Sequence, residues 1–301
     1  MIYEYALDPE LLNSWEKFRY LTEKFGVSEG RLISRFPKKW KMMVYEGLKG
    51  LGEIERTKIE VKLQEIDNKI VTRKHEYNHA STWLNNAEDE DRRDPFHAII
   101  STSNTQRNPK ILLYDNLDGT LEMWAVSRQV IVPRDAISIS NALSPFLCIA
   151  KCISFVDPYF DPYKAKTRDM LRALLEKCIQ NRNGRPLHQI EFHTLYKPEI
   201  GNFANECQQQ LPRRIPSGIT LNVYRWNEKP GGEEFHNRYI LTDIGGIELG
   251  CGLNEGNPSA TDDLTLMDSK VWTTRFEQYS SGSQTFELAE TIQITGNRVS
   301  R

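Results

Sequence analysis

The sequence predicts an α/β protein in which a mixed, largely parallel sheet is flanked by helices and is preceded by an N-terminal helical module. The first observation is that, from Asp135 onward, short runs rich in β-branched and aromatic residues alternate with longer stretches of helical periodicity. The second is that residues 1–80 combine helical spacing of apolar residues with many charged ones. Hydrophobic residues make up 39% of the chain and charged residues 27%, which is typical of a globular protein.

Residues 1–94 are predicted to form the helical, partly basic module. Asp8-Pro9-Glu10 is typical of a helix start. An acidic, polar stretch ends at Asp94-Pro95 and indicates the boundary with a second, α/β domain of residues 95–301.

Within this module, residues 31–49 bring basic side chains together with interleaved aromatic residues. Such a combination can bind the phosphates and bases of nucleic acid. The candidate nucleic-acid contacts are Arg35, Lys38, Lys39 and Lys41. The alternative is a helix whose aromatic residues lie in the core and whose lysines form its solvated face.

The second domain begins with short apolar runs in residues 96–133, which predict a small antiparallel layer. From Asp135 strands and helices alternate, which implies a largely parallel sheet covered on both faces. The expected helices are 136–151, 164–180, 203–211 and 269–279. The expected strands are 152–156, 189–193, 219–226, 234–243, 247–254 and 262–267, with one more short strand in 280–301. Sites in such sheets lie at the C-terminal ends of strands, so Asp157 and His193 are candidates to line a cleft.

Residues 234–243 are predicted to form the strand around which the site is organised. Residues two apart on a strand share a face, so His236 and Arg238 are expected to point the same way. In the next turn, Gly252 and Asn254 would allow the backbone to come close to a bound anion. A nucleophilic imidazole beside a fixed cation suits phosphodiester chemistry, and the alternative is a strand histidine hydrogen-bonded within a core.

The spacing of His236, Arg238 and Asp243, followed by Gly252 and Asn254, resembles the H-x-K-x4-D motif and the following turn of the phospholipase D superfamily. The resemblance covers roughly residues 136–280. This sequence departs from the family pattern in two ways. Arg238 stands where the family usually has lysine, and the usual Gly-Ser pair of the turn is replaced.

The resemblance implies a metal-independent mechanism without a cofactor. His236 would attack phosphorus and form a phosphohistidine, and Arg238 would bind the non-bridging oxygens. Asp243 would support the imidazole, while Gly252 and Asn254 would complete a phosphate cradle.

The family uses two such motifs, and this chain has one. A second histidine must protonate the leaving oxygen and then activate water. The resemblance leaves three sources open for it: a second copy of the chain in a homodimer, His193, or His97.

The expected activity is that of a nuclease of the phospholipase D type in a bacterial antiviral defence or restriction assembly. The expected partners are nucleic acid, with DNA favoured over RNA, a second copy of the chain, and an ATPase or helicase as a candidate partner protein. The alternative is a non-catalytic phospholipase D-like module that binds nucleic acid or a partner protein. A phospholipid substrate is disfavoured because no membrane-facing amphipathic helix is evident.

Composition and charge set further bounds. The net charge of −2 requires any nucleic-acid site to be a local patch. The five cysteines are odd in number and form no C-x-x-C pair, which argues against a disulfide framework. The sequence shows no N-terminal apolar signal segment. A cytoplasmic protein without a membrane partner is therefore expected. His75 and His79 have metal-ligand spacing but no Cys or Glu-His partner nearby, so no metal site is predicted.

Overall fold

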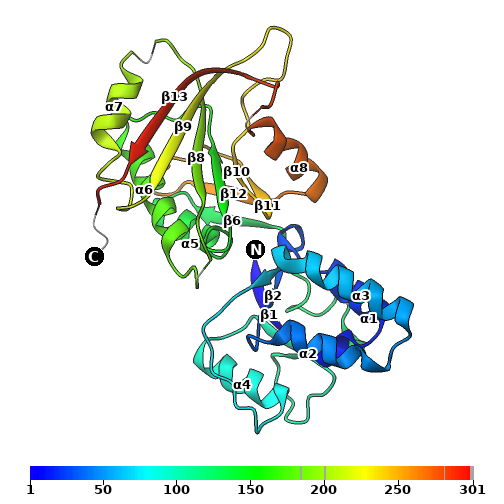
Figure 1. Cartoon of the computed structure of the whole chain (residues 1–301). Helices are drawn as coiled ribbons and strands as arrows, with labels where there is room; N and C mark the ends of the chain where they lie inside the picture. Colours follow the sequence, from blue (N-terminus) through cyan, green and yellow to red (C-terminus); the bar gives the residue numbers. More distant parts are fainter. Residues whose placement is uncertain (184, 200, 281, 299–301) are drawn as a thin grey trace. The chain divides into compact units, whose positions relative to one another are not determined.

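The computed structural model describes residues 1–183, 185–199, 201–280 and 282–298. The chain forms two compact units, residues 1–128 and residues 129–301, and each unit has its own sheet and helices (Figure 1). An α/β fold is therefore confirmed. The expected boundary at residue 94 is wrong, because strands within residues 98–113 complete the sheet of the first unit.

The first unit contains five strands in the order β3-β2-β1-β4-β5, and every neighbouring pair is parallel. The strands are β1 Tyr3–Leu7, β2 Arg31–Ser34, β3 Ile70–Val71, β4 Ala98–Ser101 and β5 Ile111–Leu113. The predictions of a purely helical module and of an antiparallel layer after it are both wrong. Short parallel strands with both faces buried lack the alternation that identifies a half-exposed strand, so the apolar residues of β1, β2 and β3 fit a helical pattern, while β4 and β5 fit strands whose direction the pattern does not give.

Helices cover both faces of this sheet. α1 Trp15–Glu23, α2 Trp40–Gly47 and α3 Glu53–Glu65 pack on the face that carries Tyr5 and Leu7. The other face, which carries Ala6, is covered by α4 Trp83–Arg93. Short 3-10 turns occupy residues 9–12, 27–29, 48–50, 66–69 and 114–116.

Asp8 is a buried carboxyl group at the C-terminal end of β1, where it caps the 3-10 turn Pro9–Leu12. Its Oδ1 accepts a hydrogen bond from the Glu10 N–H (3.0 Å), and its Oδ2 accepts one from the Ser101 hydroxyl (3.1 Å) at the end of β4. Asp8 and Ser101 thus lie where the strand order of the sheet reverses. Burial raises the pKa of Asp8 to about 6.

We expect Asp8→Asn to stabilise the first unit above pH 6. Between about pH 4 and about pH 6 the unfolded chain has released this proton while the folded chain retains it, so the free energy of unfolding falls, by up to about 3 kcal/mol. Below and above this pH range, the contribution of Asp8 to the free energy of unfolding changes little. Asparagine has no charge to bury, so the free energy of unfolding of the variant should not fall over this pH range. Hydrogen exchange of the β1 and β4 amides across this pH range measures the difference, and an equal fall in both proteins would contradict the prediction.

The second unit contains eight strands in the order β13-β9-β8-β7-β10-β11-β12-β6. They are β6 Gln129–Pro133, β7 Cys152–Val156, β8 Gln189–Leu195, β9 Thr220–Asn227, β10 Tyr239–Thr242, β11 Gly245–Leu249, β12 Thr261–Leu266 and β13 Glu287–Thr295. Only the central strands β7, β8 and β9 are parallel to one another, and all other neighbouring pairs are antiparallel. The mixed sheet is confirmed, but it is not largely parallel, because the direct turn between β10 and β11 joins antiparallel strands.

The helices of the second unit agree with the expected ones to within a few residues at each end. They are α5 Ala136–Leu147, α6 Ala165–Ile179, α7 Phe203–Gln210 and α8 Ser269–Gln278. α8 lies on one face of the sheet, over Leu241 and Met267, and α5 and α6 lie on the other side (Figure 1). In the described ranges, no helix is both long and apolar enough to cross a membrane. The five cysteines are free thiols.

Candidate active site

The candidate site lies at one edge of the second sheet. β10 runs antiparallel to β7, with Tyr239 opposite Val156, so β10 begins at the edge where β7 ends. This arrangement brings His236 and Arg238, which precede β10, to the same edge as Asp157, which follows β7. The expected strand over residues 234–243 is therefore shorter than predicted, and His236 lies in the segment leading into it.

His236 is exposed at this edge. Its side chain has 56% of its surface accessible, and its Nδ1 lies 3.8 Å from the Glu234 carboxylate. The alternative of a histidine hydrogen-bonded within a core is therefore wrong. An accessible imidazole next to a carboxylate can act as a nucleophile or as a proton donor.

Arg238 presents a cation that is not neutralised by an acidic side chain. Its guanidinium lies over the ring of Tyr159, with 4.9 Å between its Cζ and the ring centroid. The Nζ of Lys197 lies 4.3 Å from the centroid of the same ring. Within the described part of the chain Arg238 makes no ion pair, and its Nε is buried without a hydrogen-bond partner. A guanidinium in this state can bind a phosphate.

Asp157 holds the two loops of the site together. Its Oδ1 accepts a hydrogen bond from the Tyr159 N–H (2.9 Å), and its Oδ2 accepts one from the Leu253 N–H (2.7 Å). Burial raises the pKa of Asp157, while these two N–H groups and the charge of Arg238 oppose the rise. Both carboxylate oxygens of Asp157 accept hydrogen bonds from backbone N–H groups, so Asp157 positions the loops of the site. The expectation that it binds phosphate is wrong.

Gly252 and Asn254 also contribute to the packing of the loops at this edge. A Cβ atom at position 252 would lie 2.9 Å from the Asp157 Oδ2, so only glycine allows this close approach. The side-chain oxygen of Asn254 accepts a hydrogen bond from the Arg134 guanidinium. Asn254 is therefore tied to the segment that precedes α5, and the expected role of its side chain in a phosphate cradle is not supported by this geometry.

Asp243 lies at the opposite edge of the sheet. Its Oδ1 accepts hydrogen bonds from the backbone N–H groups of Lys151 (2.7 Å) and Cys152 (3.1 Å), where β7 begins. The expected role in supporting the imidazole is wrong, because β10 carries the chain away from His236 before Asp243 is reached.

We expect Asp243→Asn to keep the activity of the protein, since an amide oxygen can still accept from the β7 backbone. Asp243→Ala removes the acceptor of two N–H groups that are exposed or partly buried, so water replaces it in part and the cost should be about 1 kcal/mol of stability. Thermal unfolding measures the cost, and the hydrolysis rate at a temperature where both variants are folded measures the activity. A rate lost in the folded Asp243→Asn variant would contradict this structural role.

His193 is buried and is not available to substrate. Its ring is 1% exposed, its Nδ1 accepts a hydrogen bond from the Trp226 Nε1–H (3.1 Å), and its Nε2 lies 3.4 Å from the Glu191 carboxylate. β8 continues to Leu195, so the expectation that His193 lines a cleft at a strand end is wrong. His97 is half-buried in the first unit, stacked on Tyr3 with 4.1 Å between ring centroids.

The four candidate nucleic-acid contacts of the first unit divide into two pairs. Lys41 forms an ion pair with Asp67 (2.8 Å), and the Arg35 Nε donates to the Lys38 carbonyl (3.1 Å). Lys38 and Lys39 instead line a cavity of about 500 Å³ together with His75. Of the four expected contacts, Lys38 and Lys39 thus line this cavity.

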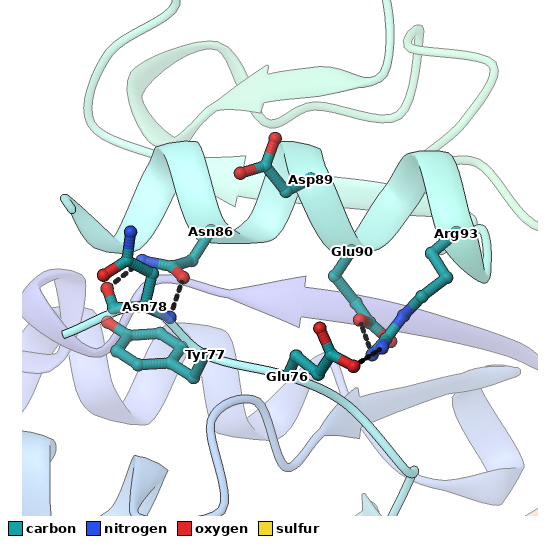
Figure 2. A pocket seen from close by; sticks show the side chains of 7 residues that line it. All are labelled: Glu76, Tyr77, Asn78, Asn86, Asp89, Glu90 and Arg93. Carbon is teal, nitrogen blue, oxygen red and sulfur yellow. Dashed lines mark hydrogen bonds and ion pairs between the residues drawn. The ribbon is translucent and has the colours of Figure 1, made fainter. Parts of the chain in front are cut away.

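A second cavity of the first unit, of about 380 Å³, lies between α4 and the extended segment before it. Figure 2 shows that several of its polar side chains are directed at one another: Asn86 pairs with the backbone of Asn78, and Arg93 pairs with Glu76 and Glu90. These contacts fasten the segment to the helix, so the cavity offers few free groups to a ligand. Across the described residues, no group of three or more His, Cys, Asp or Glu side chains is arranged to hold a metal ion.

Three contributors to the site did not emerge as candidates from the sequence: Tyr159, Lys197 and Arg134. Tyr159 and Lys197 each follow a predicted strand of the parallel centre, so their place after a strand end was a usable signal. Arg134 had no such signal, because its contact with Asn254 joins residues far apart in the chain.

No protein-family model matches this chain, and no curated protein matches it. Among solved structures the chain is similar to TrmBL2, an archaeal chromatin protein whose structure shows a novel mode of DNA binding. The sequence identity is 12%, the TM-score is 0.29, and the match spans 57% of each chain, a little over half of the neighbour's length. A likeness this weak carries no argument about fold or function.

Proposed function

We propose that this protein is a metal-independent phosphodiesterase of the phospholipase D type, with nucleic acid as its substrate. The observation that carries the proposal is the pair of an exposed His236 imidazole and an Arg238 guanidinium without an acidic partner, held at one sheet edge. Asp157 fixes the loops on both sides of this edge through backbone hydrogen bonds. A nucleophile and a preorganised cation are the parts that phosphoryl transfer needs.

In the proposed reaction, the Nε2 of His236 attacks phosphorus, since Nδ1 faces Glu234. The N–P bond forms as the P–O bond to the leaving group breaks, and a second imidazole donates the proton that this oxygen takes up. Water then attacks phosphorus, that imidazole accepts a proton from it, and the N–P bond breaks. Throughout, Arg238 binds the non-bridging oxygens, where negative charge is concentrated.

The second imidazole is proposed to be His236 of another copy of the chain. His193 is buried, its Nδ1 accepts a hydrogen bond from Trp226 and its Nε2 lies 3.4 Å from the Glu191 carboxylate, so it has no edge open to a substrate. A two-fold symmetric pair would bring two copies of the exposed His236 to one site, each in a different role.

The test is hydrolysis of labelled DNA and RNA oligonucleotides in excess EDTA. The wild type should cleave them, His236→Ala should not, and His188→Ala should act as wild type, because His188 is an exposed histidine before β8. Acid-labile, base-stable label on the protein would identify the phosphohistidine. Cleavage that requires added magnesium and survives in His236→Ala would contradict the proposal.

Further expectations belong to the same proposal. They are a preference for DNA over RNA, a role in an antiviral defence or restriction assembly in the cytoplasm, and an ATPase or helicase as partner. The second candidate function is a non-catalytic module that binds nucleic acid or a partner protein, and arginine at position 238 in place of the family's lysine favours it. Lys38 and Lys39 would then supply backbone contacts. Oligonucleotide binding without hydrolysis under any ionic condition would select this function.

A further inference from the structure

Three tyrosines stand out among the aromatic side chains of the described residues. Most large aromatic rings are buried or half-buried, but Tyr159 is 55% exposed, Tyr163 is 48% exposed and Tyr196 is 36% exposed. The other large hydrophobic side chains exposed to this degree are aliphatic or methionine. Exposing a ring loses the stabilisation that its burial would give, so a group of exposed rings on one part of a surface is a mark of binding.

All three rings belong to the edge of the sheet that carries His236. Val156 pairs with His193 in the parallel register, so the loops after β7 and β8 leave the sheet side by side. Tyr159 is the third residue after Val156, and Tyr196 is the third residue after His193, which gives them matching positions on adjacent loops. Tyr163 lies further along the first of these loops, before α6.

Cations accompany two of these rings. Arg238 and Lys197 both lie over Tyr159, and Arg225 lies over Tyr196, with 4.4 Å from its Cζ to the ring centroid. Arg225 is itself fixed, because it pairs with Glu290 (2.6 Å). Each of the two rings is therefore held by a positive charge and remains exposed in part.

We propose that Tyr159 and Tyr196 form a stacking platform that binds single-stranded nucleic acid next to His236. The faces of unpaired bases can stack on the rings, while Arg238 and Lys197 contact the phosphates between them. In a duplex the base faces are covered by neighbouring base pairs, so the platform selects single strands or unpaired nucleotides. This inference rests on the proposed function for the position of the scissile phosphate, but binding can be measured without hydrolysis.

The experiment measures fluorescence anisotropy of a labelled oligonucleotide with the full chain in the His236→Ala background. The same length is compared as a single strand, as a duplex and as an abasic single strand, which keeps the phosphates and lacks the bases. The single strand should bind most tightly. The double variant Tyr159→Leu, Tyr196→Leu should bind it at least about 30-fold more weakly, since two stacked bases are lost and each contributes about 1–3 kcal/mol.

Two controls separate stacking from other effects. Tyr159→Phe with Tyr196→Phe keeps both rings and should bind within a factor of about two of the parent, whereas leucine keeps only apolar bulk. The Val271→Ala variant removes an exposed side chain in the first turn of α8, beside Trp272, which hydrogen-bonds Thr242 at the opposite edge of the sheet, and it should bind as the parent does. The abasic strand should bind equally to parent and leucine variant, because only the bases use the rings.

Equal affinity for single strand and duplex would overturn the inference, as would unchanged affinity in the leucine variant. An equally large effect of the leucine substitutions on the affinity for the abasic strand would also overturn it, because it would indicate a general structural role of the rings. Hydrolysis of a small generic phosphodiester in EDTA by the wild type tests the proposed function separately. Stacking-dependent binding by a chain that hydrolyses nothing would refute the proposed function and leave the platform standing.

Discussion

Mixing wild-type chains with His236→Ala chains should reduce the hydrolysis rate as the square of the wild-type fraction. If two His236 side chains from two copies make one site, a mixed pair lacks either the nucleophile or the proton donor. With equal amounts of the two chains and random pairing, about a quarter of the full rate should remain. The rate is measured after co-refolding or co-expression of differently tagged chains and is plotted against the mutant fraction.

A straight line, with about half of the rate at equal amounts, would mean that each chain completes its own site. Chains with His188→Ala provide the matched control, since their mixtures should keep the full rate at every ratio. Size-exclusion mass measured on the same samples shows whether pairs are present. A monomer with full activity would refute the shared site directly.

Arg238→Ala should lower kcat/KM by about 100- to 1,000-fold, because loss of a preorganised positive group costs about 3–4 kcal/mol of transition-state stabilisation. Arg238→Lys should keep part of the rate, since an ammonium also stabilises a phosphate and lysine is the residue that the phospholipase D pattern has there. Arg238 forms no ion pair among the described residues, although its positive charge lowers the pKa of the buried Asp157 carboxyl group, an effect that Arg238→Lys keeps in part.

The matched control is Arg213→Ala, which removes an exposed arginine on the loop after α7. Steady-state kinetics on one oligonucleotide in EDTA compares all four proteins. Equal losses in Arg238→Lys and Arg238→Ala would point to a role that needs the planar guanidinium, such as its position over Tyr159. No loss in either variant would remove Arg238 from the site.

The motif spacing identified His236 and Arg238 but misjudged Asp243. The motif suggests that three residues act together, but β10 lies between Arg238 and Asp243 and separates Asp243 from the other two. Four residues of β10 span about 13 Å, and Asp243 follows them directly. Residues on the two sides of a strand lie at opposite edges of its sheet, so this outcome was implied by the predicted strand itself.

Burial explains the error at His193. Its place in a short apolar run correctly predicted a strand, but the end of that strand depends on pairing with β9, which continues to Leu195. Those two extra residues move His193 from the edge into the packing against Trp226 and Tyr279. No residue near His193 in the sequence carries that information.

What the sequence determined by itself was the series of helices and strands in residues 136–278 and the pairing of an imidazole with a cation two residues apart. These follow from side-chain periodicity and from neighbours within a few positions, which are local properties. The tertiary structure alone decided that Asp157 meets Leu253, that the adjacent loops after β7 and β8 expose three tyrosines at one edge of the sheet, and that short strands in the first unit form a parallel sheet. These depend on contacts between residues far apart in the chain, and such contacts are chosen by the packing of the whole unit.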